Sequence, residues 1–307
     1  MAESRSAPAG TELSRRAERS AVDAALRALC ERELGDIEQV NASVADAIRY
    51  SLLGGGKRLR GVLLLSAYSA AGGRDDASAL AAAVEVVHAY SLVHDDLPCM
   101  DDDDVRRGRA TLHRVFGVRA ATVAGLAMVP LAARAASRAA SALGLAASAT
   151  GRVVSELMRA SGAGGMIGGQ LLDLEGEGRP LQLFDMERVH RAKTGALIMA
   201  AVVIGGLAAQ ASDAVLQALA RYGDSVGLAF QIADDVLDVT ATSDVLGKTA
   251  GRDLALGKST FPSLLGVEGA RQRGESLVEE GCAALSDVGV LTPALAGLAR
   301  FAVRRPS

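Results

Sequence analysis

Two clusters of aspartates are the residues of this sequence best suited to chemistry. The first is the run Asp95-Asp96-Leu97-Pro98-Cys99-Met100-Asp101, and the second, about 140 residues later, is Asp234-Asp235-Val236-Leu237-Asp238. Both interrupt apolar segments, where carboxylates are costly unless a cation neutralises them. Lys and Arg residues follow each cluster. The pattern predicts a cavity in which divalent metal ions hold a polyphosphate.

The second cluster has the spacing of a single helix face. Gln231, Asp234, Asp235 and Asp238 stand at positions i, i+3, i+4 and i+7, which lie one above another on a helix. A solvated acidic surface would be the alternative interpretation. The apolar residues 226–230 that precede the cluster argue against it, and we expect this helix to be buried.

The first cluster cannot align on a regular helix, because Asp95 and Asp101 are six residues apart. Pro98 removes a backbone hydrogen bond and distorts the preceding turn. We therefore expect the chain to bring Asp101 back beside Asp95. His88 precedes Asp95 by two helical turns, and we predict that it faces the same cavity, although a lone histidine on an apolar face is more often a core residue.

Clusters that offer only oxygen ligands favour hard ions, with Mg²⁺ ahead of Zn²⁺. Mg²⁺ keeps several waters and bridges carboxylates to phosphates, which suits open clusters. The acidic run 101–104 lacks the alternating ligands and closing Glu of a calcium-binding EF-hand. Candidate phosphate-binding cations lie beside turns: Lys57, Arg58, Arg60, Arg106, Arg107, Lys193, Lys248 and Lys258.

The composition predicts an all-α fold. Half of the 307 residues are hydrophobic but only 3% are aromatic and none is Trp, and the apolar content is mainly helix-compatible Ala, Leu and Val. We expect a single domain, residues 21–307, with about ten or more helices around a deep central cavity. The polar residues 1–20 predict a disordered tail. Helices are predicted near 21–50, 77–94, 120–140, 150–174, 185–209, 212–239, 261–285 and 292–304.

Charge and cysteine content limit the partners and the compartment. A net charge of -3 gives no basic field that would recruit nucleic acid. Three scattered cysteines form no zinc or disulfide spacing, which favours a reducing compartment, the cytoplasm. The N-terminus has no apolar signal core. The longest apolar run, 195–209, is shorter than the roughly 20 residues of a membrane span, so a buried core helix is expected instead of a transmembrane segment.

Several motifs together resemble the trans-polyprenyl diphosphate synthases, in the order that this family has them, from about residue 40 to the C-terminus. They are Gly55-Gly56-Lys57-Arg58-Leu59-Arg60, His88 to His94 leading into Asp95, Arg106-Arg107-Gly108, Gly168-Gly169-Gln170 with Asp173, Lys193-Thr194-Gly195, Phe230-Gln231 and Gly247-Lys248-Thr249. The first aspartate cluster resembles the bacterial farnesyl and geranylgeranyl diphosphate synthases. The resemblance implies a homodimeric enzyme that joins isopentenyl diphosphate to allylic diphosphates.

The resemblance also implies a role for each site residue. Mg²⁺, about three ions per site and replaceable by Mn²⁺, would be bound by Asp95, Asp96, Asp101, Asp234, Asp235 and Asp238. The allylic diphosphate would contact Arg106, Lys193, Thr194, Phe230, Gln231, Lys248 and Lys258. Isopentenyl diphosphate would contact Lys57, Arg60, His88 and Arg107. The residues implied in catalysis are Asp95, Asp96, Asp101, Lys193, Asp234, Asp235 and Lys248.

Tyr90 and Ser91 are the expected determinants of product length. At about 1.5 Å per residue, Tyr90 lies roughly 7.5 Å below Asp95 on a helix. The resemblance places the family's length-setting residue there, where a bulky ring favours the fifteen-carbon product. Farnesyl diphosphate is therefore expected, with geranylgeranyl diphosphate as the close alternative. An alternative of another class is a non-catalytic subunit of a heteromeric synthase, but such subunits typically lose an aspartate cluster.

Two departures from the family pattern stand out. Gly61 occupies the position of a usual Pro after the Lys/Arg motif, and we expect a looser loop there. Leu126 follows Gly125 where an Asp is common, with Pro130 one turn later, which bears on local helix packing. A terpene cyclase is disfavoured, because the second cluster is Asp-Asp-x-x-Asp and lacks the Asn/Asp-Ser/Thr-Glu pattern that is typical of cyclases.

Overall fold

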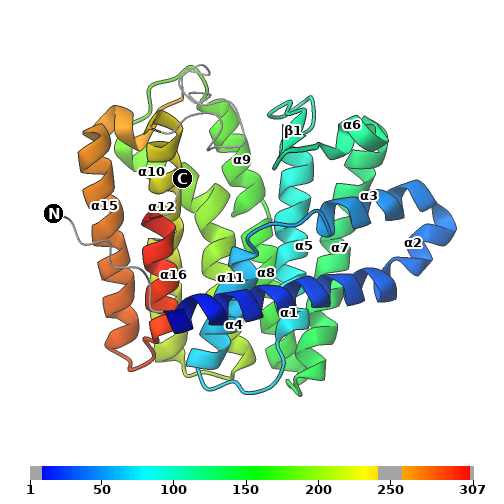
Figure 1. The fold of residues 1–307 in the computed structure, drawn as a ribbon, viewed down its shortest axis with the longest axis horizontal. Helices are drawn as coiled ribbons and strands as arrows, with labels where there is room; N and C mark the ends of the chain where they lie inside the picture. Colours follow the sequence, from blue (N-terminus) through cyan, green and yellow to red (C-terminus); the bar gives the residue numbers. More distant parts are fainter. Residues whose placement is uncertain (1–8, 241–257, 305–307) are drawn as a thin grey trace.

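Helices form most of the chain in the computed structural model, which describes residues 9–240 and 258–304, with side chains from residue 15 onward (Figure 1). The first half contains α1 (Ala9–Glu33), α2 (Gly35–Val40), α3 (Ala42–Leu52), α4 (Leu59–Ala70), α5 (Ser78–Asp95), α6 (Leu112–Phe116) and α7 (Val118–Ala142). The second contains α8 (Ala147–Ser161), α9 (Met166–Glu175), α10 (Leu183–His190), the π-helical turn η1 (Arg191–Gly195), α11 (Ala196–Ala208), α12 (Asp213–Thr240), α15 (Phe261–Ser286) and α16 (Pro293–Val303). The predicted all-α class is confirmed.

One small hairpin is the exception among the described residues. β1 (Val105–Arg106) pairs antiparallel with β2 (Arg109–Ala110) directly after the first aspartate cluster. Arg107 and Gly108 form its turn, both with positive φ, which is the backbone that tight hairpins require. The hairpin extends from the same end of the molecule as the C-terminus of α5 (Figure 1).

Short-range signals explain where several helices begin. The Asn41 side chain accepts from Val44 N–H at the start of α3, and Thr292 does the same for Leu295 before α16. Thr260 and Ser263 form a reciprocal capping box ahead of α15. Such caps satisfy backbone N–H groups that have no partner within their helix.

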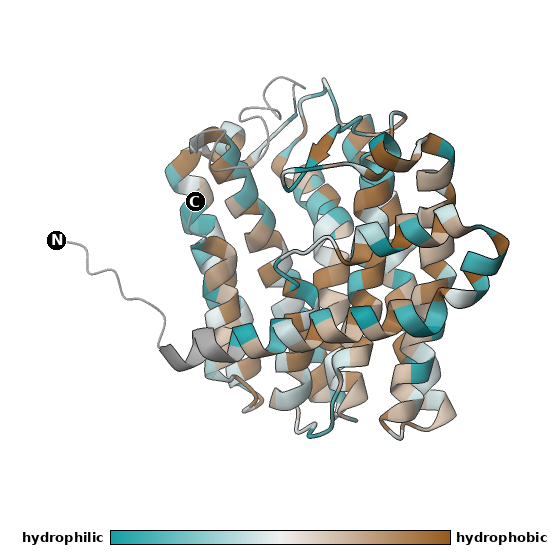
Figure 2. Cartoon of the chain, turned by 45° about the vertical axis from the view of Figure 1, so that its right-hand side comes forward, coloured by the Kyte–Doolittle hydropathy of each residue, from teal (hydrophilic) through white to brown (hydrophobic). Residues whose placement is uncertain are grey.

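The N-terminal boundary differs from the prediction. α1 begins at Ala9, so residues 9–20, expected to belong to a disordered tail, are helical. Val22, Leu26 and Leu29 are buried at helical spacing on this element. The polar residues that suggested disorder belong to a helix that crosses in front of the others, with hydrophilic residues along its length (Figures 1 and 2). The buried stripe begins at Val22, and residues 15–20, none of them buried, continue the same helix towards the N-terminus.

Two hydrophobic clusters make up the core and share helices. The first is built mainly on α1, α3, α5, α7 and α8, and the second on α12, α15 and α16. Both α4 and α11 contribute to each cluster: Leu64 and Leu197 belong to the first, whereas Leu63 and Ile198 belong to the second. These two helices therefore join the two halves of the core.

The predicted helix at 150–174 is two helices, because the chain breaks between α8 and α9 at Gly162–Gly165. Residues 183–208 instead form one continuous rod, α10, η1 and α11, as predicted for 185–209.

Among the residues that the structure describes, two stretches are long and apolar enough to cross a membrane by length and composition alone: Val118–Ala142 and Leu183–Ala208. The second is 72% buried in the protein, in agreement with the expected core helix. The first packs one face against α5.

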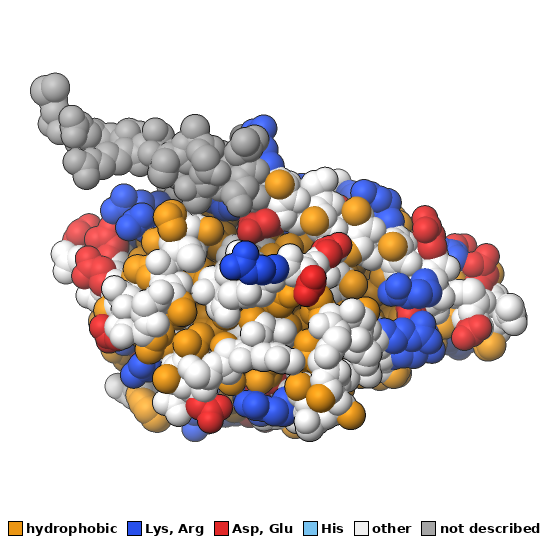
Figure 3. Space-filling model, turned by 90° about the horizontal axis from the view of Figure 1, so that it is seen from below, with side chains coloured by type: hydrophobic (Ala, Val, Ile, Leu, Met, Phe, Trp, Pro, Cys, Tyr) orange, Lys and Arg blue, Asp and Glu red, His pale blue; other side chains and the backbone are white. Residues whose placement is uncertain are grey.

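Basic and acidic side chains are interspersed among hydrophobic ones over the described part of the face seen in Figure 3, consistent with the small net charge.

Candidate active site

A cavity of about 890 Å³ opens among α5, α9, η1, α12 and the start of α4. This volume lies in the range of small-molecule binding sites. The sequence-predicted residues that line it are Lys57, Arg60, His88, Tyr90, Ser91, Asp95, Asp101, Arg106, Arg107, Lys193, Thr194, Phe230, Gln231, Asp234, Asp235 and Lys258. Asp96 and Asp238 are buried behind the lining, and Lys248 lies outside the described residues.

The first aspartate cluster folds back as predicted. α5 ends at Asp95, and the Asp101 N–H donates to the Asp95 carbonyl at 2.8 Å. Pro98 lies in the turn that follows the helix, and so it ends the helix instead of kinking it. The turn places the Asp95 and Asp101 side chains in the cavity lining.

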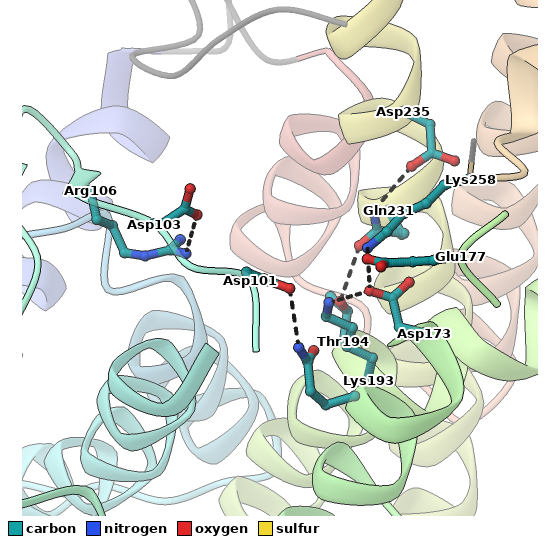
Figure 4. Close-up of polar contacts among 11 residues, drawn as sticks. Asp101, Asp103, Arg106, Asp173, Glu177, Lys193, Thr194, Gln231, Asp235 and Lys258 are labelled. Atoms are coloured by element: carbon teal, nitrogen blue, oxygen red, sulfur yellow. Dashed lines mark hydrogen bonds and ion pairs between the residues drawn. The ribbon is translucent and has the colours of Figure 1, made fainter. Parts of the chain in front are cut away.

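Burial raises the pKa of Asp95 to about 6, although nearby Lys193 opposes this effect. Arg106 is held by two carboxylates of the same loop: its Nε donates to Asp96 Oδ1 at 2.6 Å and its Nη2 contacts Asp103 Oδ2 at 3.4 Å. Figure 4 shows Arg106 and Asp103 on the opposite side of the cavity from the second cluster. Asp96 thus positions an arginine in this structure, while Asp95 and Asp101 face the cavity.

The second cluster lies on α12, and its carboxylates differ in their surroundings. Asp235 is buried, accepting from Gln231 Nε2 on Oδ1 and from the Phe261 N–H on Oδ2, both at 3.1 Å. Asp234 lines the cavity. Asp238 Oδ1 is buried with no hydrogen-bond partner. The helix face predicted from the spacing therefore exists, with Asp235 tying α12 to the start of α15.

The π-helical turn η1 presents Lys193 and Thr194 to the cavity, as π-turns in helices often do at functional sites. Thr194 Oγ1 donates to Gln231 Oε1 at 3.0 Å, which connects η1 to the second cluster. α9 approaches η1 closely at Gly169, where a side-chain Cβ would overlap the Lys193 backbone. The glycine of the Gly168-Gly169-Gln170 motif is therefore required by packing.

Asp173 joins two lysines that are 65 residues apart in the sequence. Its Oδ2 accepts from Lys193 Nζ at 2.7 Å and from Lys258 Nζ at 2.9 Å (Figure 4). Although burial opposes the charge, the two ammonium groups lower the pKa of Asp173 to about 2. Lys258 also contacts Glu177 at 3.2 Å. Asp173 was recognised in the sequence as part of a motif but without a role, since no local spacing reveals this pairing.

His190 is a second lining residue that the sequence did not reveal. Its Nε2 is buried without a hydrogen-bond partner and lies 3.8 Å from Asp235 Oδ2, and its ring stacks on Phe261. Burial lowers its pKa to about 4, so the ring is neutral at pH 7. The Gln170 amide, on the neighbouring α9, donates to Asp101 at 3.4 Å.

Basic residues converge around His88 at the other end of the cavity. Burial lowers the pKa of His88 well below its usual value, and the charges of Arg60, Arg107, Arg106 and Arg58 lower it further. His88 Nδ1 is buried without a hydrogen-bond partner. Lys57, Arg60 and Arg107 line the same region. A neutral ring surrounded by guanidinium groups marks a place suited to an anion.

Arg58 and Glu85 fix the loop that carries Lys57 and Arg60. Arg58 is buried in a left-handed conformation, with Nε bonded to Asp23 at 2.8 Å and Nη1 at 3.9 Å from Glu85. Gly61 N–H donates to Glu85 Oε1 at 2.9 Å. A proline could not make this bond. The loop that Gly61 was expected to loosen is therefore tied to α5 at Gly61 itself.

The second departure has no effect on helix continuity. α7 runs unbroken from Val118 to Ala142 with Pro130 inside it, and Leu126 is 59% exposed.

Tyr90 and Ser91 both line the cavity, one turn below Asp95. The Tyr90 ring is only 4% exposed and meets the His94 ring edge-on, with centroids 5.0 Å apart. Burial and the charge of Asp95 raise the pKa of Tyr90 to about 12, so the phenol is neutral. Ser91 Oγ donates to the His88 carbonyl. These two side chains narrow the cavity beside α5.

The donor set available to a cation consists of carboxylate oxygens on two sides of one cavity. Within residues 9–240 and 258–304, no three His, Cys, Asp or Glu side chains converge into a ready-made metal cage. A hard ion with water and substrate oxygens in its remaining positions suits such a set, and the buried oxygen of Asp238 would gain a partner from it.

Comparisons with known proteins agree with this geometry. The model of the polyprenyl synthetase family matches residues 41–288. The farnesyl diphosphate synthase of Escherichia coli is 45% identical over 270 residues, which cover 86% of this chain and 90% of that protein. The chloroplastic geranylfarnesyl diphosphate synthase of Leucosceptrum canum is 46% identical over 240 residues, 77% of this chain and 66% of that protein.

A solved structure shares the fold. The geranyltransferase of Helicobacter pylori, crystallised with magnesium and isoprenyl diphosphate, superposes with a TM-score of 0.74 at 32% identity, covering 85% of this chain and 86% of that one. The family model spans most of the chain and includes both aspartate clusters, the π-turn and the basic loops. The chain therefore belongs to the polyprenyl synthetase family of prenyltransferases.

Proposed function

We propose that this protein condenses isopentenyl diphosphate with an allylic diphosphate, dimethylallyl or geranyl, and releases mainly farnesyl diphosphate. The observation that carries the proposal is a single cavity with a cationic region around His88 and an acidic region formed by the two aspartate clusters. Two diphosphates fit such a division, one held by guanidinium and ammonium groups and the other through metal ions. The relative in Escherichia coli is named for the same product.

Magnesium is the cofactor that the acidic region fits best. The residues that would hold it are Asp95, Asp96, Asp101, Asp234, Asp235 and Asp238, all oxygen donors. The relative from Helicobacter pylori contains magnesium together with an isoprenyl diphosphate. When bound, the metal would neutralise the diphosphate and weaken the allylic C–O bond. We further propose about three ions per site, replaceable by Mn²⁺.

The allylic diphosphate would lie between the two clusters, against Lys193, Thr194 and Lys258. Lys193 and Lys258 are presented by η1 and the segment before α15, and Gln231 orients Thr194. Arg106 and Phe230 complete the lining, and Lys248 is assigned here from its motif alone. Each unit charge near 4 Å contributes roughly 4 kcal/mol in a partly shielded site before desolvation, so these cations favour departure of the leaving group.

Isopentenyl diphosphate would bind at Lys57, Arg60, His88 and Arg107. Its alkene then attacks the allylic carbon as the C–O bond breaks, which forms the new C–C bond and a tertiary cation. The released diphosphate accepts the proton that leaves, and a new double bond results. The nucleophile is the alkene of isopentenyl diphosphate, so the protein does not need to supply one. The carboxylates and cations that line the cavity would instead bind the two diphosphates.

Product length is assigned to Tyr90, with Ser91 beside it. The ring is nearly fully buried and is supported by His94, so it offers a firm obstacle to a growing prenyl tail. The named relatives make products of different lengths. Farnesyl diphosphate follows from the size of this ring, and geranylgeranyl diphosphate is the alternative.

We also propose a homodimer in the cytoplasm. α7 exposes the apolar side chains Val118, Val123 and Leu126, a pattern that commonly marks association surfaces. Cys30, Cys99 and Cys282 are free thiols, which supports a reducing compartment.

The deciding experiment is an assay of the purified chain with isopentenyl and dimethylallyl diphosphates and Mg²⁺, with chromatography of the dephosphorylated products. We expect mainly the fifteen-carbon alcohol, no product in EDTA, and recovery with Mg²⁺ or Mn²⁺ but not with Ca²⁺ alone. A chain that is inactive alone but stimulates a partner synthase would be the regulatory subunit of the alternative. A mainly twenty-carbon product would reject the assignment of Tyr90.

A further inference from the structure

The β1–β2 hairpin carries Arg107, one of the proposed isopentenyl diphosphate ligands, but is too small to hold itself in place. Each strand has two residues, and only Val105 with Ala110 and Arg106 with Arg109 are paired. Isolated hairpins of this size are not stable in water. Arg107 also has positive φ, 53°, which is costly for a residue with a side chain. Contacts outside the hairpin must therefore fix the position of Arg107.

Arg106 anchors strand β1 to Asp96 and Asp103, and Tyr50 near the end of α3 anchors strand β2. The Arg109 guanidinium lies over the Tyr50 ring, 4.1 Å from its centroid, within the range of cation–π attraction. The Tyr50 hydroxyl donates to the Ala110 carbonyl at 2.8 Å. The ring also packs edge-on against Phe116 of α6, with centroids 5.7 Å apart. One aromatic residue thus contacts strand β2 through both a side chain and the backbone.

The glycine-rich loop that follows α3, residues 54–56, contacts both Arg107 and Arg109. Arg107 Nη1 donates to the Gly55 carbonyl at 3.0 Å. A Cβ on Gly56 would overlap the Arg107 guanidinium, and a Cβ on Gly54 would lie 2.6 Å from Arg109 Nη1. This loop leads directly into Lys57. Because a guanidinium has five N–H donors, Arg107 keeps others for an anion while one is bonded to Gly55.

We infer that Tyr50 and Arg109 are positioning residues that hold Arg107 and the Lys57 loop together as one subsite for isopentenyl diphosphate. This inference rests on the proposed function, which assigns Arg107 and Lys57 to that substrate. Arg109 is next to the residues that bind the anion, but its guanidinium is committed to the Tyr50 ring. The allylic subsite at Lys193 and Lys258 belongs to different elements, η1 and the segment before α15. Loss of the Tyr50–Arg109 contact should therefore affect one substrate and spare the other.

Steady-state kinetics of Arg109→Ala, Arg109→Lys and Tyr50→Phe test the inference, with each substrate varied in turn. Arg109→Ala should raise KM for isopentenyl diphosphate about fivefold or more, since a cation–π contact of about 1 kcal/mol is lost. KM for geranyl diphosphate and kcat should stay within about twofold. Arg109→Lys keeps a cation above the ring and should restore most of the affinity. Tyr50→Phe keeps the ring and loses the hydroxyl bond, so its KM for isopentenyl diphosphate should rise less.

Arg159→Ala is the matched control, because this substitution removes the same positive charge. Arg159 lies on α8, where it pairs with Glu156 of its own helix. Equal increases in both Michaelis constants, or no change in either, would overturn the inference. If Arg109→Ala does not fold, the same comparison is decided by Tyr50→Phe. Failure of the proposed function is recognised separately, because the unmodified chain would then form no prenyl product. Calorimetric titration with isopentenyl diphosphate in EDTA gives a readout without turnover, and unchanged affinity in Arg109→Ala would also contradict the inference.

Discussion

Asp95 and Asp173 show how the surroundings of a carboxylate set its chemistry. Both are mostly buried, yet the pKa of Asp95 rises to about 6 and that of Asp173 falls to about 2. The difference follows from partners: Asp173 accepts from two ammonium groups, whereas Asp95 faces the cavity near Asp101 and Asp96. A carboxylate that is destabilised without a cation is suited to binding one. A carboxylate that is already paired serves to hold its lysines.

Replacement of Asp234 tests the acidic region. Asp234→Asn keeps the size of the side chain but removes the charge that would bind the metal, and we expect turnover to fall at least about 100-fold, the scale of a lost transition-state contact of about 3 kcal/mol. Steady-state assays with thermal unfolding as a check on the fold measure this. Asp213→Asn, at the exposed start of the same helix, is the control and should stay near wild type. Normal turnover in a folded Asp234→Asn protein would reject the metal assignment.

Replacement of Tyr90 tests the length assignment. Tyr90→Ser removes the ring that rests against His94 and opens space beside α5, so the product should shift from fifteen toward twenty carbons. Tyr90→Phe retains the ring and should keep the fifteen-carbon product. Chromatography at saturating isopentenyl diphosphate gives the distribution. An unchanged distribution in Tyr90→Ser would place the limiting residue elsewhere in the cavity.

The paired carboxylate Asp173 predicts a dependence of stability on pH. Because its pKa is lower in the folded protein than in the unfolded chain, its contribution is complete above about pH 4 and is lost as pH falls toward about 2. Asp173→Asn should therefore lower the free energy of unfolding by up to about 2 kcal/mol near pH 6 and by much less near pH 2. Urea unfolding of both proteins across this range measures the difference. A gap that stays constant with pH would contradict the pairing.

At the scale of elements, the site depends on where helices end or change their winding. α5 stops at Asp95, η1 widens one turn at Lys193, and α15 begins at Phe261 with its N–H on Asp235. Apolar periodicity and turn residues predicted six ranges to within a few residues, because both signals are local: α5, α7, the rod from α10 to α11, α12, α15 and α16. The range 21–50 instead spans α1, α2 and α3, and α4 and α6 were not predicted. The π-turn left no local signal. The helical residues 9–20 were missed because their polar composition suggested a tail, whereas they continue the helix whose buried stripe begins at Val22.

The second aspartate cluster could be recognised from spacing alone, since a helix fixes which residues share a face. The partners of Asp173 and Asp235 could not, because Lys258, Phe261 and His190 approach them from elements distant in sequence. The spacing between Asp95 and Asp101 needed one physical argument, that Pro98 distorts the helix. The structure confirms that Asp101 returns to Asp95, although α5 ends before Pro98 instead of being distorted by it. The sequence thus indicated which groups line the candidate site but not which residues hold them in place.

The close approach of α9 to η1 predicts the effect of adding one methyl group. Gly169→Ala would overlap the Lys193 backbone, and overpacking of this kind costs about 1–3 kcal/mol. We expect a lower melting temperature and reduced kcat, since Lys193 must move. Gly164→Ala in the same glycine-rich segment meets no atom within 4 Å and should leave both values near wild type. Equal behaviour of the two variants, measured by thermal unfolding and kinetics, would rule out packing as the reason for Gly169.

At the scale of the whole molecule, the two halves of the core meet across the helices that also frame the cavity. The first aspartate cluster ends α5, in the first hydrophobic cluster, and the second lies on α12, in the other. α4 and α11 contribute to both. Relative movement of the halves would change the spacing of the carboxylates that are proposed to bind metal, so the shared helices would have to be rigid for the proposed chemistry.

The exposed face of α7 predicts the oligomeric state. If a second copy covers Leu126, Leu126→Arg should convert a dimer to a monomer in sedimentation velocity, because a charge would be buried without a partner. Phe184→Arg on α10, a more exposed apolar residue far from α7 in Figure 1, is the control and should remain dimeric. A wild-type monomer, or a dimer that tolerates Leu126→Arg, would refute this interface.

In the substrate-free protein, the carboxylate of Asp173 would compete with the allylic diphosphate for the same two lysines. It carries one negative charge and occupies the two lysines that the allylic diphosphate is proposed to use. An incoming anion must therefore exchange with it, and only a ligand of higher charge gains enough from the exchange. Carboxylates and other singly charged anions would be poor rivals on this basis. The pairing of Asp173 with Lys193 and Lys258 reduces the repulsion between the two ammonium groups. It would also set the minimum negative charge that a ligand needs in order to bind at this site.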